Sequence, residues 1–240
     1  MILNIWFYLT LAFLLINLCA YALRQAQPDR GWQRLIVFTK PLTLLMLIIW
    51  SWTAGDFWQG RMMWFGVALL FSLLGDICLL FPARWFMTGL FAFLLTHVCY
   101  LLAFNQDIWW TDLRWTFSAS FSNLLLLSSA ALLAGFVLGK IDSSVSRTRR
   151  DTRLRVTLLA YSLVLTLMLL SAVSTRARAD WPLQASWLVS LGAGLFFASD
   201  ILLAYNRFVR PLKWGNVWVI GLYHVGQVFL VLGALIFSGA

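Results

Sequence analysis

Long apolar segments separated by short polar ones run along the whole chain. Each apolar segment is about twenty residues long, the length that an α-helix needs to cross a hydrocarbon core of about 30 Å. Apolar residues are continuous in stretches such as 42–50 and 163–170, without the in-out alternation of barrel strands. Because lipid cannot hydrogen-bond an exposed backbone, these segments must be helices. The pattern therefore predicts an all-α integral membrane protein.

Eight transmembrane helices are predicted, in one transmembrane domain that covers residues 1–240. Their ranges are 2–23, 35–53, 62–81, 86–104, 117–138, 156–174, 185–205 and 215–238. The connections are short except for 140–155, a polar segment rich in serine and arginine that is expected to form a cytoplasmic linker loop. We expect the first helix to be retained, because no basic residue precedes its apolar run and the run is too long for a signal peptide.

Composition agrees with this class. Hydrophobic residues make up 62% of the chain and charged residues only 11%, whereas soluble domains carry about a quarter charged residues. The net charge of +9 could indicate nucleic-acid binding, but the basic residues lie in short loops between helices. Anionic lipid headgroups explain them better, so we expect membrane lipids and no nucleic acid as partners. Oligomeric state is left open.

The loop charges also predict an orientation. Thirteen Lys and Arg residues fall in the loops on one side, against four on the other. The four are Arg61, Arg114, Arg176 and Arg178. Because cytoplasmic loops carry the excess of basic residues, both termini are expected outside the cytoplasm. The protein is expected in a bacterial inner (plasma) membrane.

Two acidic residues interrupt the apolar segments. They are Asp76 and Asp200, and the other seven aspartates lie in loops. An ionised carboxyl at the centre of a membrane helix costs about 2.5–3.5 kcal/mol on the more lenient scale. A buried, protonated aspartate bonded to a neighbouring helix is one explanation. The similarity of the two sites favours the other, which is a functional pair.

That similarity extends to an internal repeat. Leu74-Gly75-Asp76-Ile77 corresponds to Ala198-Ser199-Asp200-Ile201, and the next segment in each case carries one of the two histidines, His97 or His224. A four-helix unit used twice, over about 1–104 and 117–240, explains this pattern. Because four is even, the two repeats would be parallel and related by an axis along the membrane normal. Each aspartate would then lie five residues before the cytoplasmic end of its helix, at one depth.

Polar side chains accompany the histidines at helical spacing. Tyr100 lies one turn after His97, while Tyr223 and Gln227 flank His224. Structural hydrogen bonds and a role at a site are both open for these residues. Lys40, near the start of the second helix, is either a lysine that extends to the interface or a cation that binds a lipid phosphate. No compact metal-ligand spacing occurs, so neither a metal nor a cofactor is expected.

Five short motifs resemble the YhhN family of eight-span membrane proteins. The motifs are Lys40-Pro41-Leu42-Thr43, Leu74-Gly75-Asp76, Thr96-His97-Val98-Cys99-Tyr100, Ala198-Ser199-Asp200 and Tyr223 with Gln227. The resemblance covers about residues 40 to 235. It implies site residues at Lys40, Asp76, His97, Asp200, Tyr223 and Gln227. The chain departs from the family at His224, where tyrosine is common, and in its longer basic loop.

The animal members of that family are lysoplasmalogenases, so the resemblance implies cleavage of the vinyl-ether bond of lysoplasmalogens. The products would be a fatty aldehyde and glycerophosphoethanolamine or glycerophosphocholine. We expect one of Asp76 and Asp200 to protonate the alkenyl group and the other to stabilise the resulting cation, much as paired carboxylates do in glycosidases. Which does which is open. Five further residues would orient the pair and water, and Lys40 would hold the phosphate of the lysophospholipid substrate. The five are His97, Tyr100, Tyr223, His224 and Gln227.

Two other functions use the same residues. A small proton-coupled transporter or lysolipid carrier also combines repeats with intramembrane acids and histidines. A lipid-binding scaffold would bind lysolipid without turnover. Release of aldehyde in detergent distinguishes hydrolysis from both.

Overall fold

A computed structural model describes residues 2–55, 59–81, 83–106 and 152–239, together with Gly135 and Gly139. Within these residues the fold is all-α, with seven long helices and two short 3-10 turns. In chain order they are α1 (Ile5–Ala26), α2 (Arg30–Ala54), α3 (Gly60–Leu80), η1 (Ala83–Trp85), α4 (Phe86–Asn105), α7 (Thr152–Ser174), η3 (Thr175–Ala177), α8 (Leu183–Phe208) and α9 (Gly215–Ser238). The predicted helix at 117–138 and most of the linker at 140–155 lie outside the described residues.

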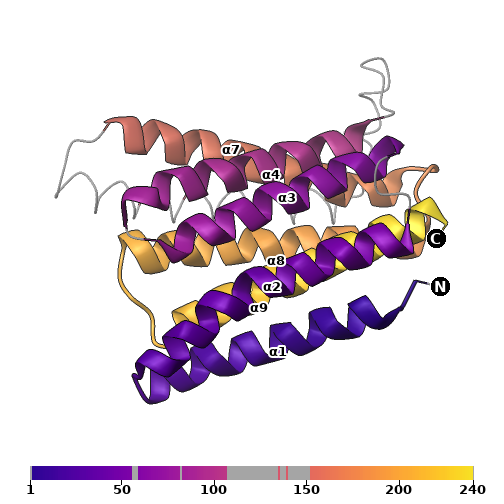
Figure 1. Ribbon diagram of the computed structural model, residues 1–240. Helices are drawn as coiled ribbons and strands as arrows, with labels where there is room; N and C mark the ends of the chain where they lie inside the picture. Colours follow the sequence, from indigo (N-terminus) through magenta and orange to yellow (C-terminus); the bar gives the residue numbers. More distant parts are fainter. Residues whose placement is uncertain are drawn as a thin grey trace.

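The long helices lie side by side in a bundle, and each is long and apolar enough to cross a membrane (Figure 1). Both termini lie at one end of the bundle. The α1–α2 turn, η1 and the α8–α9 connection lie at the opposite end, which we call the loop end. The prediction of an integral membrane protein is confirmed at this level.

Several helices extend beyond the apolar segments that predicted them. α2 begins at Arg30 rather than at residue 35, because the Asp29 side chain accepts a hydrogen bond from the Gly31 N–H and caps the helix. α7 already includes residues 152–155 of the expected linker. α8 continues past Tyr205 to Phe208. Hydrophobicity marks where a helix meets lipid, whereas capping groups in the interface decide where it ends.

These boundaries correct one expectation. Asp200 lies eight residues before the end of α8, and Asp76 lies four residues before the end of α3. The prediction of five residues in both helices is therefore wrong.

α8 and α9 pack most closely where two glycines face each other. A Cβ atom on Gly192 would lie 2.7 Å from the Gly226 carbonyl oxygen, and one on Gly226 would lie 2.8 Å from the Gly192 carbonyl oxygen. Small residues allow two membrane helices to approach at backbone distance. Further along the same interface the Ser199 hydroxyl donates to the Val219 carbonyl at 2.9 Å. This contact fixes α9 against the helix that carries Asp200.

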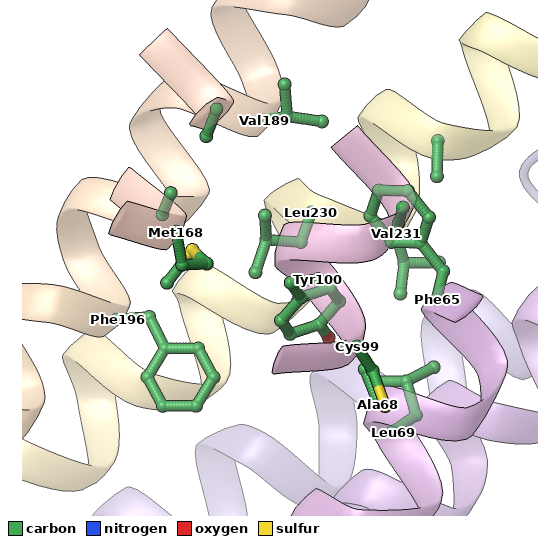
Figure 2. Close-up of a cluster of buried hydrophobic side chains, with 14 of the residues drawn as sticks. Phe65, Ala68, Leu69, Cys99, Tyr100, Met168, Val189, Phe196, Leu230 and Val231 are labelled. Carbon is green, nitrogen blue, oxygen red and sulfur yellow. The ribbon is translucent and has the colours of Figure 1, made fainter. Parts of the chain in front are cut away.

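A dense apolar cluster joins α3, α4, α7, α8 and α9 (Figure 2). Phe65, Tyr100, Met168, Phe196 and Leu230 are all fully buried in it. Phe196 precedes Asp200 by one helical turn, and Tyr100 follows His97 by one turn. The cluster therefore supports the polar residues directly from the side of the chain termini.

The α7–α8 turn is tied to α4 by an ion cluster at the end of the bundle where the termini lie. Arg178 donates to both carboxylate oxygens of Asp180, at 2.9 and 2.6 Å, and to the Phe104 carbonyl oxygen at 2.6 Å. Burial acts to raise the pKa of Asp180, but the hydrogen bonds from Arg178 and the charges of Arg178 and Arg61 outweigh it, so that this pKa is lowered.

The two glycines of α8 offer a matched test of this packing. Gly192→Ala should lower the thermal unfolding temperature in detergent, because its new methyl group meets the α9 backbone. Gly194→Ala has nothing within 4 Å of its Cβ and should leave that temperature unchanged or raise it, since alanine favours helix by about 1 kcal/mol over glycine. Equal effects of the two substitutions would contradict the close approach of α8 and α9.

Candidate active site

A cavity of about 420 Å³ extends between the helices from the loop end of the bundle. Asp76 and Asp200 both line it, together with Lys40 and Tyr223. The two carboxyls come from α3 and α8, which are far apart in the sequence. The structure thus brings the two predicted aspartates to one cavity.

Asp76 is paired with a buried lysine. Lys40 Nζ lies 3.0 Å from Asp76 Oδ1, and the two residues are only 4% and 1% exposed. Neither charge could remain in such surroundings without its partner. From the sequence, Lys40 was either a lysine that extends to the interface or a phosphate ligand, whereas in the structure its ammonium group is buried and paired with Asp76.

His224 approaches the other oxygen of the same carboxyl. Its Nε2 lies 3.9 Å from Asp76 Oδ2, too far for a direct hydrogen bond. Its Nδ1 lies 3.1 Å from the Ile220 carbonyl oxygen, which can only accept, so Nδ1 carries a proton. His224 Nε2 and the Tyr223 hydroxyl are buried and have no hydrogen-bond partner among the described residues. The Tyr223 hydroxyl interacts with Asp76 and Ser72, so a polar group that enters beside Asp76 would also meet Tyr223 and His224.

Asp200 has a tyrosine and a histidine beside it instead. The Tyr161 hydroxyl donates to Asp200 Oδ2 at 2.5 Å, and His97 Nε2 lies 2.8 Å from the same oxygen. Tyr161 and His97 are themselves 3.0 Å apart. The three side chains form a closed, buried triangle, of which Asp200 lines the cavity.

Each aspartate meets a histidine from the other half of the chain. Asp76 of α3 faces His224 of α9, and Asp200 of α8 contacts His97 of α4. In the sequence, by contrast, each histidine lies on the helix that follows an aspartate of its own half. The crossing arises because α4 packs against α7 while α9 packs against α2. Neither half of the chain therefore supplies both the aspartate and the histidine of one contact.

Tyr161 was missed by the sequence analysis. It precedes Asp200 by 39 residues, close to the 36 that separate Lys40 from Asp76. Both residues lie on the helix before the one that bears the aspartate. Aligning the two halves by their aspartates places Tyr161 three residues, about one helical turn, before the position equivalent to Lys40.

Tyr100 and Gln227 bind each other rather than an aspartate. The Tyr100 hydroxyl donates to Gln227 Oε1, and Gln227 Nε2 donates to Ser72 Oγ at 2.9 Å. Ser72 Oγ lies 3.1 Å from Thr96 Oγ1. This network joins α3, α4 and α9 beside the carboxyls, so these residues hold the helices that carry the site.

The family model of the YhhN family matches residues 35–234. This chain belongs to the YhhN family. Every predicted site residue and Tyr161 fall within the matched part. No solved structure matches the chain.

Curated relatives match this YhhN-family chain over most of its length. Lysoplasmalogenase TMEM86B of Sus scrofa is 30% identical over 204 residues, which cover 84% of this chain and 75% of the relative. The Mus musculus protein of the same name is 29% identical, with 85% and 76% covered. The Homo sapiens protein is 28% identical over 222 residues, with 92% and 84% covered.

Measurements of unfolding are sufficient to test the ion pair between Lys40 and Asp76. Lys40→Met and Asp76→Asn each leave one buried group without its partner and should each destabilise the protein by about 3 kcal/mol or more. The double variant removes both charges and should unfold in detergent at a higher temperature than either single variant. Additive losses in the double variant would show that the two groups do not interact.

Proposed function

We propose that this protein is a membrane-embedded lysoplasmalogenase, an ether hydrolase that cleaves the vinyl-ether bond of a lysoplasmalogen. The observation that carries the proposal is the pair of carboxyls on one cavity, with a lysine beside one and a tyrosine and a histidine beside the other. Membership of the YhhN family and the relatives named lysoplasmalogenase support the same reaction.

The unlike surroundings of the carboxyls suggest their roles. Asp76 beside the Lys40 ammonium acts as the carboxylate that stabilises positive charge. Asp200, which contacts Tyr161 and His97 and lines the cavity, acts as the acid. Its proton adds to the β-carbon of the alkenyl group, whose π electrons form the new C–H bond and leave an oxocarbenium ion. Preorganised negative charge where a cation develops is the strongest general source of catalysis.

Water completes the reaction. It adds to the cationic carbon and returns a proton to Asp200, which gives a hemiacetal. The carbon–oxygen bond of the hemiacetal then breaks, the hydroxyl oxygen forms the carbonyl as it loses its proton, and a proton adds to the departing oxygen, which gives the fatty aldehyde and the glycerophospho-alcohol. The Tyr223 hydroxyl and His224 Nε2 lie where they can orient that water beside Asp76.

The finer architecture belongs to the same proposal: eight spans in two parallel four-helix repeats, in a bacterial inner membrane with both termini outside. The crossed contacts support the repeat, since α2, α3 and α4 match α7, α8 and α9 in order and in packing. α4 and α7 also run in the same direction (Figure 1), as two repeats with one further span between them require. Seven described basic residues support a cytoplasmic loop end: Arg24, Arg30, Arg34, Arg84, Arg207, Arg210 and Lys213.

The reaction is tested by aldehyde release from lysoplasmalogen in detergent. Wild type should release aldehyde, and Asp76→Asn and Asp200→Asn should each lose about 100-fold or more of turnover while remaining folded, as expected for general-acid and charge-stabilising groups. Asp29→Asn is the matched control, because asparagine also caps a helix. No aldehyde in detergent, with proton-dependent flux in liposomes, would instead identify a transporter.

Tyr161 is proposed as the residue that positions Asp200. Tyr161→Phe removes one hydroxyl and should lower kcat about tenfold or more with little change in KM, since the lost bond acts on the acid and not on the lipid. The pH profile of kcat should shift as well. Tyr205→Phe on α8, away from the cavity lining, serves as the control. An unchanged pH profile in Tyr161→Phe would leave Tyr161 with a purely structural role.

A further inference from the structure

The cavity has two polar ends joined by an apolar wall. At its inner end, the floor, lie Lys40, Asp76, Asp200 and Tyr223. At the loop end, the mouth, lie Arg24, Gln33, Arg207 and Asn216. Ile36, Leu79, Leu203 and Val219 line the stretch between them. This order of polar, apolar and polar surface suits an amphiphilic ligand that has one reactive or charged group at each end of the cavity.

The number of residues between floor and mouth on one helix gives the distance between these two ends of the cavity. On α8, Arg207 follows Asp200 by seven residues, and on α2, Gln33 precedes Lys40 by seven. Seven residues make almost two full turns, so each pair lies on one helix face. At 1.5 Å per residue the separation along each helix is about 10 Å.

The mouth carries two cations. Arg24 lies in the last turn of α1 and Arg207 in the last turn of α8, and both are exposed. Among the described residues no carboxylate forms a salt bridge with either. The Arg207 guanidinium lies 5.0 Å from the centre of the Phe86 ring, which holds it at the cavity. α9 begins beside them with no side-chain cap, and its second residue, Asn216, lines the mouth. Uncapped first-turn N–H groups add positive potential there.

We propose that Arg24 and Arg207 bind the phosphodiester of a single-chain glycerophospholipid and so set the register of its ether bond at the two aspartates. This rests on the proposed function for the identity of the reacting bond. Seven covalent bonds separate the phosphorus from the β-carbon of the alkenyl group, and an extended chain of that length spans about 8 Å. With its β-carbon at Asp200, the lipid places its phosphate within reach of both guanidinium groups. Arginine is well suited to a phosphate because it can donate two parallel hydrogen bonds.

In this arrangement the lipid phosphate binds at the mouth of the cavity and does not contact Lys40. A phosphate on Lys40 would compete with Asp76 for the ammonium group at 3.0 Å and would bring the headgroup to the floor, where the ether bond must react. With the phosphate at the mouth, the ammonium remains with Asp76 and the rest of the headgroup extends toward solvent.

Binding of inert ether lipids tests the phosphate site without turnover. 1-O-Alkyl-glycerophosphoethanolamine and 1-O-alkylglycerol differ by the phosphoethanolamine headgroup that carries the phosphate and have no vinyl group. Wild type should bind the first at least about tenfold more tightly, as charge-assisted hydrogen bonds predict. Arg24→Gln/Arg207→Gln should bind the two lipids alike. Retention of the preference by this double variant would overturn the proposal.

Arg34→Gln/Arg210→Gln is the matched control. It removes the same charge from the same end of the bundle, and neither residue lines the cavity. The control should keep the wild-type preference, whereas an equal loss would show a general surface-charge effect and overturn the assignment. Inorganic phosphate is the third ligand: displacement of the bound ether lipid by millimolar phosphate would identify a site for free phosphate instead of a lipid headgroup.

Turnover supplies the second measurement. Arg24→Gln/Arg207→Gln should raise the KM for lysoplasmalogen about tenfold or more and leave both kcat and the cleavage of phosphate-free 1-alkenylglycerol unchanged. A fall in kcat without a change in KM would contradict a binding role. If wild type released no aldehyde from any lipid, the proposed function would fail, while the binding experiment would still decide the phosphate site.

Discussion

A charge buried among apolar helices must find its partner inside the protein, and this requirement organises the whole site. Desolvation of a carboxylate and an ammonium costs several kcal/mol for each ion, and only a close, well-placed partner offsets it. Asp76 and Lys40 meet at 3.0 Å with almost no exposed surface. Since the partners lie on α2 and α3, this ion pair fixes how the two helices sit beside each other. It also leaves a stable negative charge on the cavity.

Asp200 has a tyrosine and a histidine in place of a lysine. Tyr161 and His97 both contact its Oδ2 atom, and they come from α7 and α4. Two chemically identical side chains thus acquire different surroundings, one with a full cation and one with a hydroxyl and an imidazole. Such a difference is what allows paired carboxyls to divide the roles of acid and charge stabiliser.

The crossed contacts make the two halves interdependent. His97 and His224 each reach the aspartate of the other half, and the Gln227 amide connects α9 to Tyr100 and Ser72 behind them. The close approach of α8 and α9 at Gly192 and Gly226 sets where this network lies. The cavity that results is charged at its floor, apolar along its wall and basic at its mouth, a surface that suits a lysolipid with its headgroup toward the loop end.

Sequence alone determined the class, the seven helices that the structure describes and the two aspartates at the centre of the site. These followed because the length of an apolar run and an acid within it are local properties, and the energetic demands of lipid on backbone and charge act locally too. Helix ends were less certain, since Asp29 and the end of α8 extend the helices into the polar interface. Only the tertiary structure decided which histidine meets which aspartate, that Lys40 pairs with Asp76, and that Tyr161 belongs to the site. The two histidine contacts join helices that are distant in the chain, whereas Lys40–Asp76 and Tyr161–Asp200 each join successive helices. All of them depend on how side chains pack between helices, as where α4 packs on α7 and α9 on α2, which no spacing along one sequence records.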